Sequence, residues 1–169
     1  MTKRLFFFVF SLIATVAMQA QSLNGTWVSK MNDDEGTAID LYFIFNKPNL
    51  TMKAVVVVND NDAGEFTVSF QLPGTYTQTD KKLTINMNKD KVKLNIDKMK
   101  FTPEMEKVIK EKPELKDTVQ KMMEEALAGM KPEVVKELPP NGDLVIKELT
   151  ATKLVLDDDG DKMEFTKVR

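Results

Sequence analysis

The feature that most constrains this chain is an alternation of apolar and polar residues with a period of two, over about 25–102. Successive side chains of a β-strand point to opposite faces of the sheet, so the alternation predicts strands with one buried and one wet face. The clearest examples are 39–45, 66–72, 83–87 and 92–96. The alternation changes parity after Asp97, which predicts a β-bulge near Lys98.

The number and spacing of these strands predict a barrel. Short, turn-rich connections separate the strands, and the alternation returns over 143–149, 152–157 and 162–168. We count 64–79 as one strand bent at Pro73-Gly74, which gives about nine strands. An antiparallel meander with one apolar face loses its exposed edges by closing on itself. We therefore predict a mostly β fold, an antiparallel up-and-down barrel of about eight to nine strands.

The segment 103–138 has a helical period instead, with apolar residues at steps of three and four between Lys and Glu. Proline is tolerated in the first turn of a helix but not in its interior. Pro103, Pro113 and Pro132 therefore predict two main helices, over about 103–112 and 113–130, and a short third turn near 133–138. The result is a helical hairpin inserted before the last strands.

Residues 1–20 have the pattern of a secretory signal peptide. Lys3 and Arg4 form a basic start, an apolar run follows over 5–17, and Ala20 is a small residue before Gln21. The apolar run is short for a bilayer span, which needs about 20 residues. We expect an exported protein, periplasmic or secreted, with one mature domain over 21–169 and no membrane span after cleavage.

The composition removes several kinds of chemistry. The chain has no His and no Cys, so it has no disulfide, thiol nucleophile, imidazole metal ligand or Ser-His-Asp triad. We expect no metal and no cofactor. Without Lys3 and Arg4 the formal net charge of -2 becomes about -4, which disfavours nucleic acid as a partner.

Three short motifs resemble those of the small secreted lipocalin-like domains of bacteria. They are Gly25-Thr26-Trp27, then Gly74-Thr75-Tyr76 followed by Lys82-Leu83-Thr84-Ile85, and the closing run 146–156. The resemblance implies an antiparallel barrel that holds an apolar small molecule, with Trp27 at its closed end. It also implies a basic residue of the last strand across Trp27, for which Lys167 and the final Arg169 are the candidates. The helical insertion departs from the family, because the familiar lipocalin helix follows the barrel strands.

The inward face of the predicted barrel has two interpretations. A barrel of about eight strands is narrow enough for side chains to fill it or to leave room for one small ligand. The predicted ligand-binding residues are Trp27, Leu41, Phe43, Phe45, Met52, Val56, Phe66, Val68, Phe70, Ile85, Met87, Leu94 and Ile96. This face has no charged residue over those strands, so we expect a small hydrophobic ligand.

An alternative function is the binding of a protein partner or of a second copy. The helical insertion has a methionine stripe, which is either an adaptable partner surface or the core face of a packed helix. Four outward residues also predict an apolar patch on two adjacent strands: Tyr42, Ile44, Val55 and Val57. We expect the insertion to cover this patch; if it does not, the patch is a candidate partner or dimer site.

Catalysis and Ca²⁺ binding have less support in the sequence. The acidic segments 59–65 and 157–161 offer oxygen ligands but lack the bidentate Glu of an EF-hand, so we interpret them as hairpin turns. Most acids lie in predicted turns and helices, and Glu148 is the first to test because its parity matches that of inward Leu144 and Ile146. We expect a binding protein that is not an enzyme.

Overall fold

The computed structural model describes residues 22–32, 37–137 and 141–168, so the expected signal peptide lies outside the described residues. Its strands are β1 (Gly25–Asn32), β2 (Ala38–Asn46), β3 (Asn49–Asp60), β4 (Gly64–Gln78), β5 (Lys82–Met87), β6 (Lys93–Phe101), β7 (Gly142–Leu149), β8 (Lys153–Asp158) and β9 (Asp161–Lys167). A 3₁₀ turn, η1 (Lys89–Lys91), joins β5 to β6, and the helices α2 (Pro103–Glu111) and α3 (Glu114–Glu137) lie between β6 and β7.

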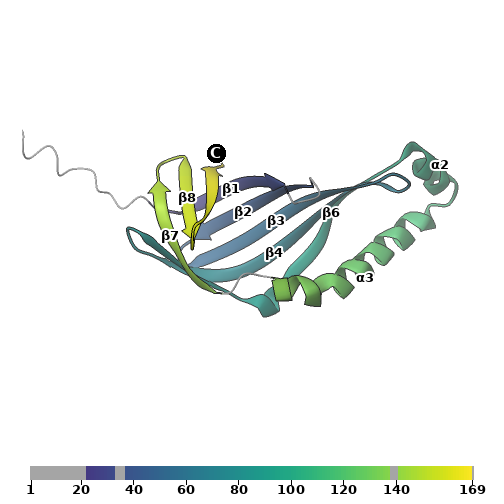
Figure 1. Ribbon diagram of the computed structural model, residues 1–169. Coiled ribbons are helices and arrows are strands. Elements are labelled where there is room, and N and C mark those ends of the chain that lie inside the picture. The colour runs from purple at the N-terminus through teal and green to yellow at the C-terminus, as the bar shows by residue number, and fades with distance from the viewer. Residues whose placement is uncertain (1–21, 33–36, 138–140, 169) are drawn as a thin grey trace, which may run out of the picture.

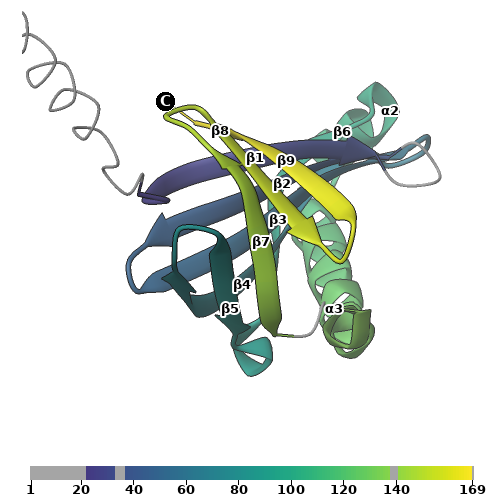
Figure 2. The ribbon, with the colours of Figure 1, turned by 60° about the vertical axis from the view of Figure 1, so that its left-hand side comes forward.

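Eight of these strands close into an antiparallel barrel (Figures 1 and 2). Their order is β3-β2-β1-β9-β8-β7-β5-β4, and the pairing of β3 with β4 closes the ring. Strand β6 lies outside the ring, on the edge of β4. The predicted mostly β barrel with helices inserted before the last strands is therefore confirmed.

Strand β4 is shared between the barrel and the outer strand. Its first part pairs with β6 as far as Gln71, and from Gly74 onward the same edge pairs with β5. Pro73, which has no N–H to donate, lies where the partner changes. A Cβ at Gly74 would lie 2.5 Å from the backbone oxygen of Asn86, so the close approach of β5 requires glycine here. The prediction of a single strand that runs through Pro73-Gly74 is therefore confirmed.

The sheet continues beyond the barrel as an extension, which we call the wing. It consists of β6 and the neighbouring parts of β3 and β4, residues 54–60 and 64–71, and extends to the right in Figure 1. In β6 the pairing passes from Ile96 opposite Val68 to Lys98 opposite Thr67, so Asp97 is the extra residue of a bulge. The predicted bulge is confirmed, and it returns Met99 to the face of Ile96.

The helices pack against the wing. The side chain of Thr102 accepts the backbone N–H of Met105 at 3.2 Å and caps α2, with Pro103 in the first turn. Helix α3 then runs back along β6 toward the barrel (Figure 1). It continues through Pro132 to Glu137, so the predicted separate turn near 133–138 is wrong. Val135 packs against the barrel core, and this contact favours continuing the helix although Pro132 loses one hydrogen bond.

One end of the barrel is closed by a solid apolar core. Trp27 is fully buried there, and its indole N–H donates to the backbone oxygen of Leu23 at 2.7 Å. The rings of Phe45 and Tyr76 meet edge to face with centroids 4.9 Å apart. The buried leucines of this end are Leu23, Leu50, Leu72, Leu83, Leu154 and Leu156. The Gly25-Thr26-Trp27 motif therefore lies at the closed end, as the resemblance implies.

Candidate functional site

An apolar cavity of about 220 Å³ lies inside the barrel next to the closed end. Its walls come from β2, β3 and β4 on one half of the ring and from β5, β7, β8 and β9 on the other. The apolar lining residues are Leu41, Phe43, Met52, Leu72, Ile85, Met87, Leu144 and Met163, with Gly142, Asp143 and Asp158 completing the wall. The period-two alternation produces this wall, because it directs every second side chain of each strand inward.

Five of the predicted ligand-binding residues line this cavity. They are Leu41, Phe43, Met52, Ile85 and Met87. Trp27 and Phe45 are instead packed in the solid closed end. The other predicted residues lie on the wing or at its base, on the inward parity of their strands: Val56, Phe66, Val68, Phe70, Leu94 and Ile96. The sequence pattern assigned the face correctly but could not show that the sheet outgrows the barrel.

The predicted residues on β6 lie near α3 rather than in the barrel. Leu94 and Ile96 line a separate hollow of about 410 Å³, whose other wall includes Glu124 and Leu127 of α3. This hollow is open and about equally polar and apolar, since Lys93 and Lys131 also line it. It is therefore less suited than the barrel cavity to an apolar molecule.

Three apolar lining residues and the polar ones were missing from the sequence prediction. Leu72 and Leu144 belong to alternating runs, so their inward parity was already visible. Met163 follows the β8–β9 turn, where the run is short. Asp143 and Asp158 lie at strand ends, where parity alone does not distinguish a cavity wall from a solvated turn.

The exposed lining residues mark the open side of the cavity. We call Gly142, Asp143 and Asp158 the rim; all three are exposed, whereas the lining residues Phe43, Leu72 and Met87 are buried. Asp143 is engaged on both oxygens: Lys82 Nζ lies 2.7 Å from Oδ2, and the Thr84 hydroxyl donates to Oδ1 at 2.6 Å. The hydrogen bond from Lys82, supported by that from Thr84, lowers the pKa of Asp143 below its usual value. Asp143 therefore remains ionised and paired.

Glu148, the first acid to test for catalysis, does not face the cavity. A bulge lies between Ile146 and Glu148, and Glu148 pairs with Val155 rather than with an inward residue. Its carboxylate forms an ion pair with Lys153 at 2.9 Å, and its side chain is 42% exposed. The prediction from parity is wrong here because the bulge reverses the faces of the strand after Ile146.

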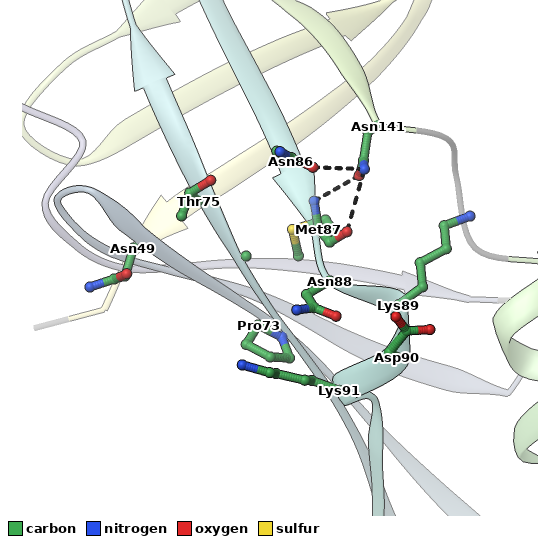
Figure 3. Close-up of a pocket in the computed structure, with 11 residues that line it drawn as sticks. Asn49, Pro73, Thr75, Asn86, Met87, Asn88, Lys89, Asp90, Lys91 and Asn141 are labelled. Carbon is green, nitrogen blue, oxygen red and sulfur yellow. Dashed lines mark hydrogen bonds between the residues drawn. The ribbon is translucent and has the colours of Figure 1, made fainter.

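A second hollow, of about 660 Å³, lies on the outer surface where η1 follows β5 (Figure 3). Its lining is rich in amide and charged side chains, including Asn49, Asn86, Asn88, Lys89 and Asn141. Asn141 accepts the backbone N–H of Met87 at 2.7 Å and donates to the side-chain oxygen of Asn86 at 2.8 Å. These bonds extend the β5–β7 pairing by one step. The hollow lacks the apolar wall of the barrel cavity.

The helices do not cover the predicted outer patch, so that prediction is wrong. They pack against β6, which is two strands away from β3 in the sheet. Ile44 and Val57 remain 36% and 37% exposed. Their cross-strand neighbours are Thr51 and Thr67, so polar side chains interrupt the patch. Isolated apolar residues of this kind are common on protein surfaces.

Both acidic segments form turns. Asp159 and Gly160 have positive φ angles of 49° and 108° and make the tight β8–β9 turn, which confirms the predicted Asp-Gly hairpin. In the other segment Asp60 Oδ1 accepts the N–H groups of Asp62 and Ala63 at 2.9 and 2.7 Å. Over residues 22–32, 37–137 and 141–168, no group of three or more acids is close enough to hold a metal ion.

Comparisons with protein-family models and with curated proteins found no match to this chain. In the described residues, none of the helices has the length and apolar character that crossing a bilayer requires.

Proposed function

We propose that this protein binds a small apolar ligand, or the apolar end of a larger one, in the barrel cavity without catalysing a reaction. The observation that carries the proposal is an apolar cavity of about 220 Å³ inside an otherwise well-packed barrel. Protein interiors contain few voids larger than a water molecule, and empty ones reduce stability. A cavity of this kind therefore favours a ligand that fills it.

The dimensions of the cavity limit the ligand. Pockets that enclose a drug-sized ligand have about 300–1,000 Å³, so this cavity holds a smaller molecule or one flexible chain end. Met52, Met87 and Met163 line it, and their unbranched side chains adapt to ligands of different shape. A single alkyl chain or a small ring suits this wall better than a large polycyclic molecule.

The closed antiparallel barrel and the Gly25-Thr26-Trp27 motif at its closed end support a lipocalin-like assignment for the domain. Under the same proposal, the protein is exported and acts in the periplasm or outside the cell. A catalytic role has less support. Asp143 is held in an ion pair, and Glu148 faces away from the cavity.

Displacement of a fluorescent probe tests the proposal. The probe is N-phenyl-naphthylamine, an apolar dye that brightens when it leaves water. Leu144 lines the cavity and its neighbour Val145 is 43% exposed on the opposite face, so Leu144→Trp fills the cavity while Val145→Trp is the matched control. We expect dye binding to the parent protein and to V145W, and its loss in L144W.

A second pair of variants covers the case in which L144W does not fold. Met163→Trp fills the cavity from β9, and Glu164→Trp adds the same side chain on the outer face of that strand. Urea denaturation establishes that each variant is folded before dye is added. If the parent protein binds no dye, or if both cavity-filled variants bind it as the controls do, the proposal is wrong.

A second candidate function is self-association or partner binding through α3. Met122 and Met130 are 64% and 56% exposed on this helix, which is the observation that favours it. Sedimentation velocity of the parent protein and of a Met122→Lys, Met130→Lys variant tests self-association. A concentration-dependent dimer that the double variant abolishes would support it, and a monomer at all concentrations would exclude the dimer.

A further inference from the structure

We infer that the barrel cavity selects an amphiphile with a cationic head group, such as an alkyl amine or alkylammonium, over a fatty-acid anion. This inference rests on the proposed function and assigns the chemical class of the ligand. The cavity holds the apolar chain, and its rim determines the charge of the head group that remains in water.

The first step is the charge of the cavity wall. The only charged residues that line it are Asp143 and Asp158, both acidic and both at the exposed rim. The two Arg residues of the chain, Arg4 and Arg169, fall outside the described residues, and no Lys lines the cavity. A carboxylate head group would therefore meet acidic side chains and no guanidinium to bind it.

The second step is that one of these two charges is uncompensated. Asp143 is neutralised by Lys82 at 2.7 Å. Asp158 has no ion-pair partner anywhere in the described part of the chain. The nearby lysines lie beside Asp157 instead. Lys147 Nζ is 3.7 Å from Asp157 Oδ2, and Lys162 is paired with Asp157 across the β8–β9 ladder. Asp157 belongs to the other face of β8, away from the cavity.

The third step is the residue opposite Asp158. In the β8–β9 ladder Asp158 pairs directly with Asp161, and the next pair on the same face, two residues further in, is Leu156 with the lining residue Met163. Residues paired in this way share a face, so Asp161 has the same inward parity as Asp158. Like charges directly opposite each other on a sheet repel. A cationic head group at the rim would relieve this repulsion while its chain occupies the cavity.

Two amphiphiles with the same chain test the inference: dodecyltrimethylammonium and dodecanoate, each below its micelle concentration, compete for the naphthylamine dye. A unit charge about 4 Å from an opposite charge gains roughly 1 kcal/mol in water, so the cation should bind at least about fivefold more tightly than the anion. The difference should shrink as salt is raised, because the head group and the rim are exposed.

Charge reversal at the rim gives the matched comparison. Asp158→Lys should reduce or invert the preference, and Glu164→Lys makes the same change in net charge on the outer face of β9 and should leave the preference intact. Asp158→Asn, a smaller change, should give an intermediate preference and serves if the lysine variant does not fold.

The outcomes separate the two proposals. Failure of the parent protein to bind dye or either amphiphile rejects the proposed function itself. Dye binding with equal or tighter binding of dodecanoate overturns the head-group inference and leaves the cavity function standing. The inference is also overturned if the cation is preferred but neither Asp158 variant changes the ratio.

Discussion

The ammonium nitrogen of Lys167 lies 5.0 Å from the centroid of the Trp27 ring. At this distance the positive charge is attracted to the electron-rich ring face. The resemblance to lipocalin-like domains implied a basic residue of the last strand across this tryptophan, and Lys167 of β9 makes that contact. Trp27 is itself fully buried, so the contact closes the end of the barrel opposite the rim.

Removal of the Lys167 charge should weaken the closed end. We expect Lys167→Met, which keeps a side chain of similar length without the charge, to lower the free energy of unfolding by about 0.5–1 kcal/mol. Lys167→Arg keeps the charge and should retain most of the stabilisation. Urea unfolding followed by fluorescence measures both, because Trp27 is the only tryptophan. Equal stability of the methionine and arginine variants would show that the contact is only packing.

Gly25 should be difficult to replace, for two separable reasons. Its φ of 118° is rare for other residues, and a Cβ there would lie 2.9 Å from Lys167 Cε. Gly160 has a similar φ of 108° but no atom within 4 Å of its Cβ position, so Gly160→Ala reports the backbone strain alone. We expect Gly160→Ala to cost about 1–3 kcal/mol of unfolding free energy and Gly25→Ala to cost more. Equal losses in the two variants, or a larger loss in Gly160→Ala, would contradict this prediction.

The outer face of the wing holds a polar contact that should depend on pH. Ser69 is fully buried and its hydroxyl donates to Asp97 Oδ1 at 2.8 Å, while Lys53 Nζ lies 3.0 Å from Oδ2. Burial alone raises the pKa of Asp97, but the hydrogen bonds from Ser69 and Lys53 and the Lys53 charge outweigh it and lower the pKa. The folded state therefore favours the ionised form of Asp97.

The stabilisation from this contact should be present at neutral pH and lost in acid. It is complete above the ordinary Asp pKa of 3.8 and disappears as the pH falls through the lower pKa of the folded state. We expect Ser69→Ala to lower the free energy of unfolding by about 1 kcal/mol at neutral pH. The difference in unfolding free energy between this variant and the parent protein should narrow as the pH falls below 3.8. Thr67→Ala on the same strand is the control. A pH-independent loss in S69A would assign the effect to packing.

Gly74 and Gly129 should respond in opposite directions to alanine. A Cβ at Gly74 would lie 2.5 Å from Asn86 O and 2.6 Å from Met87 Sδ, and the backbone atom cannot move aside. We expect Gly74→Ala to lower the unfolding free energy by about 1–3 kcal/mol. Gly129 lies in α3, and no atom lies within 4 Å of the position its Cβ would take. Gly129→Ala should therefore raise the unfolding free energy by about 0.5–1 kcal/mol. Thermal unfolding of both variants checks the signs.

Local periodicity predicted most of the fold because the determinants are local. The alternation located the strands, and the parity change after Asp97 located the bulge. The predicted end of the last helix is wrong because a distant contact, Val135 against the barrel core, outweighs the local effect of Pro132. The wing was also absent from the prediction, since the division of β4 between two partners depends on pairings far apart in sequence.

The candidate site was predicted less completely than the fold. Parity identified inward residues such as Phe43 and Met87, but it does not say which of them meet across a cavity and which, like Phe66, lie on the wing. From the sequence alone, Asp158 belongs only to a predicted turn. Its significance depends on the position of the β8–β9 hairpin at the rim, which only the assembled barrel determines.

Strand β6 and the two helices have a simple relationship to the ring of strands. Strands β5 and β7 are antiparallel neighbours, with Ile85 opposite Gly142, and Asn141 bonds to Met87. Without the segment 88–141 the barrel would be an uninterrupted meander in which every strand pairs with the next one in the chain. The segment is thus the elongated tip of a single hairpin, at a kind of position where chains commonly accept inserted sequence. The appendage stays joined to the barrel by buried Val92, by Val135 against the core and by the pairing of β6 with β4, so these contacts limit how far it can change.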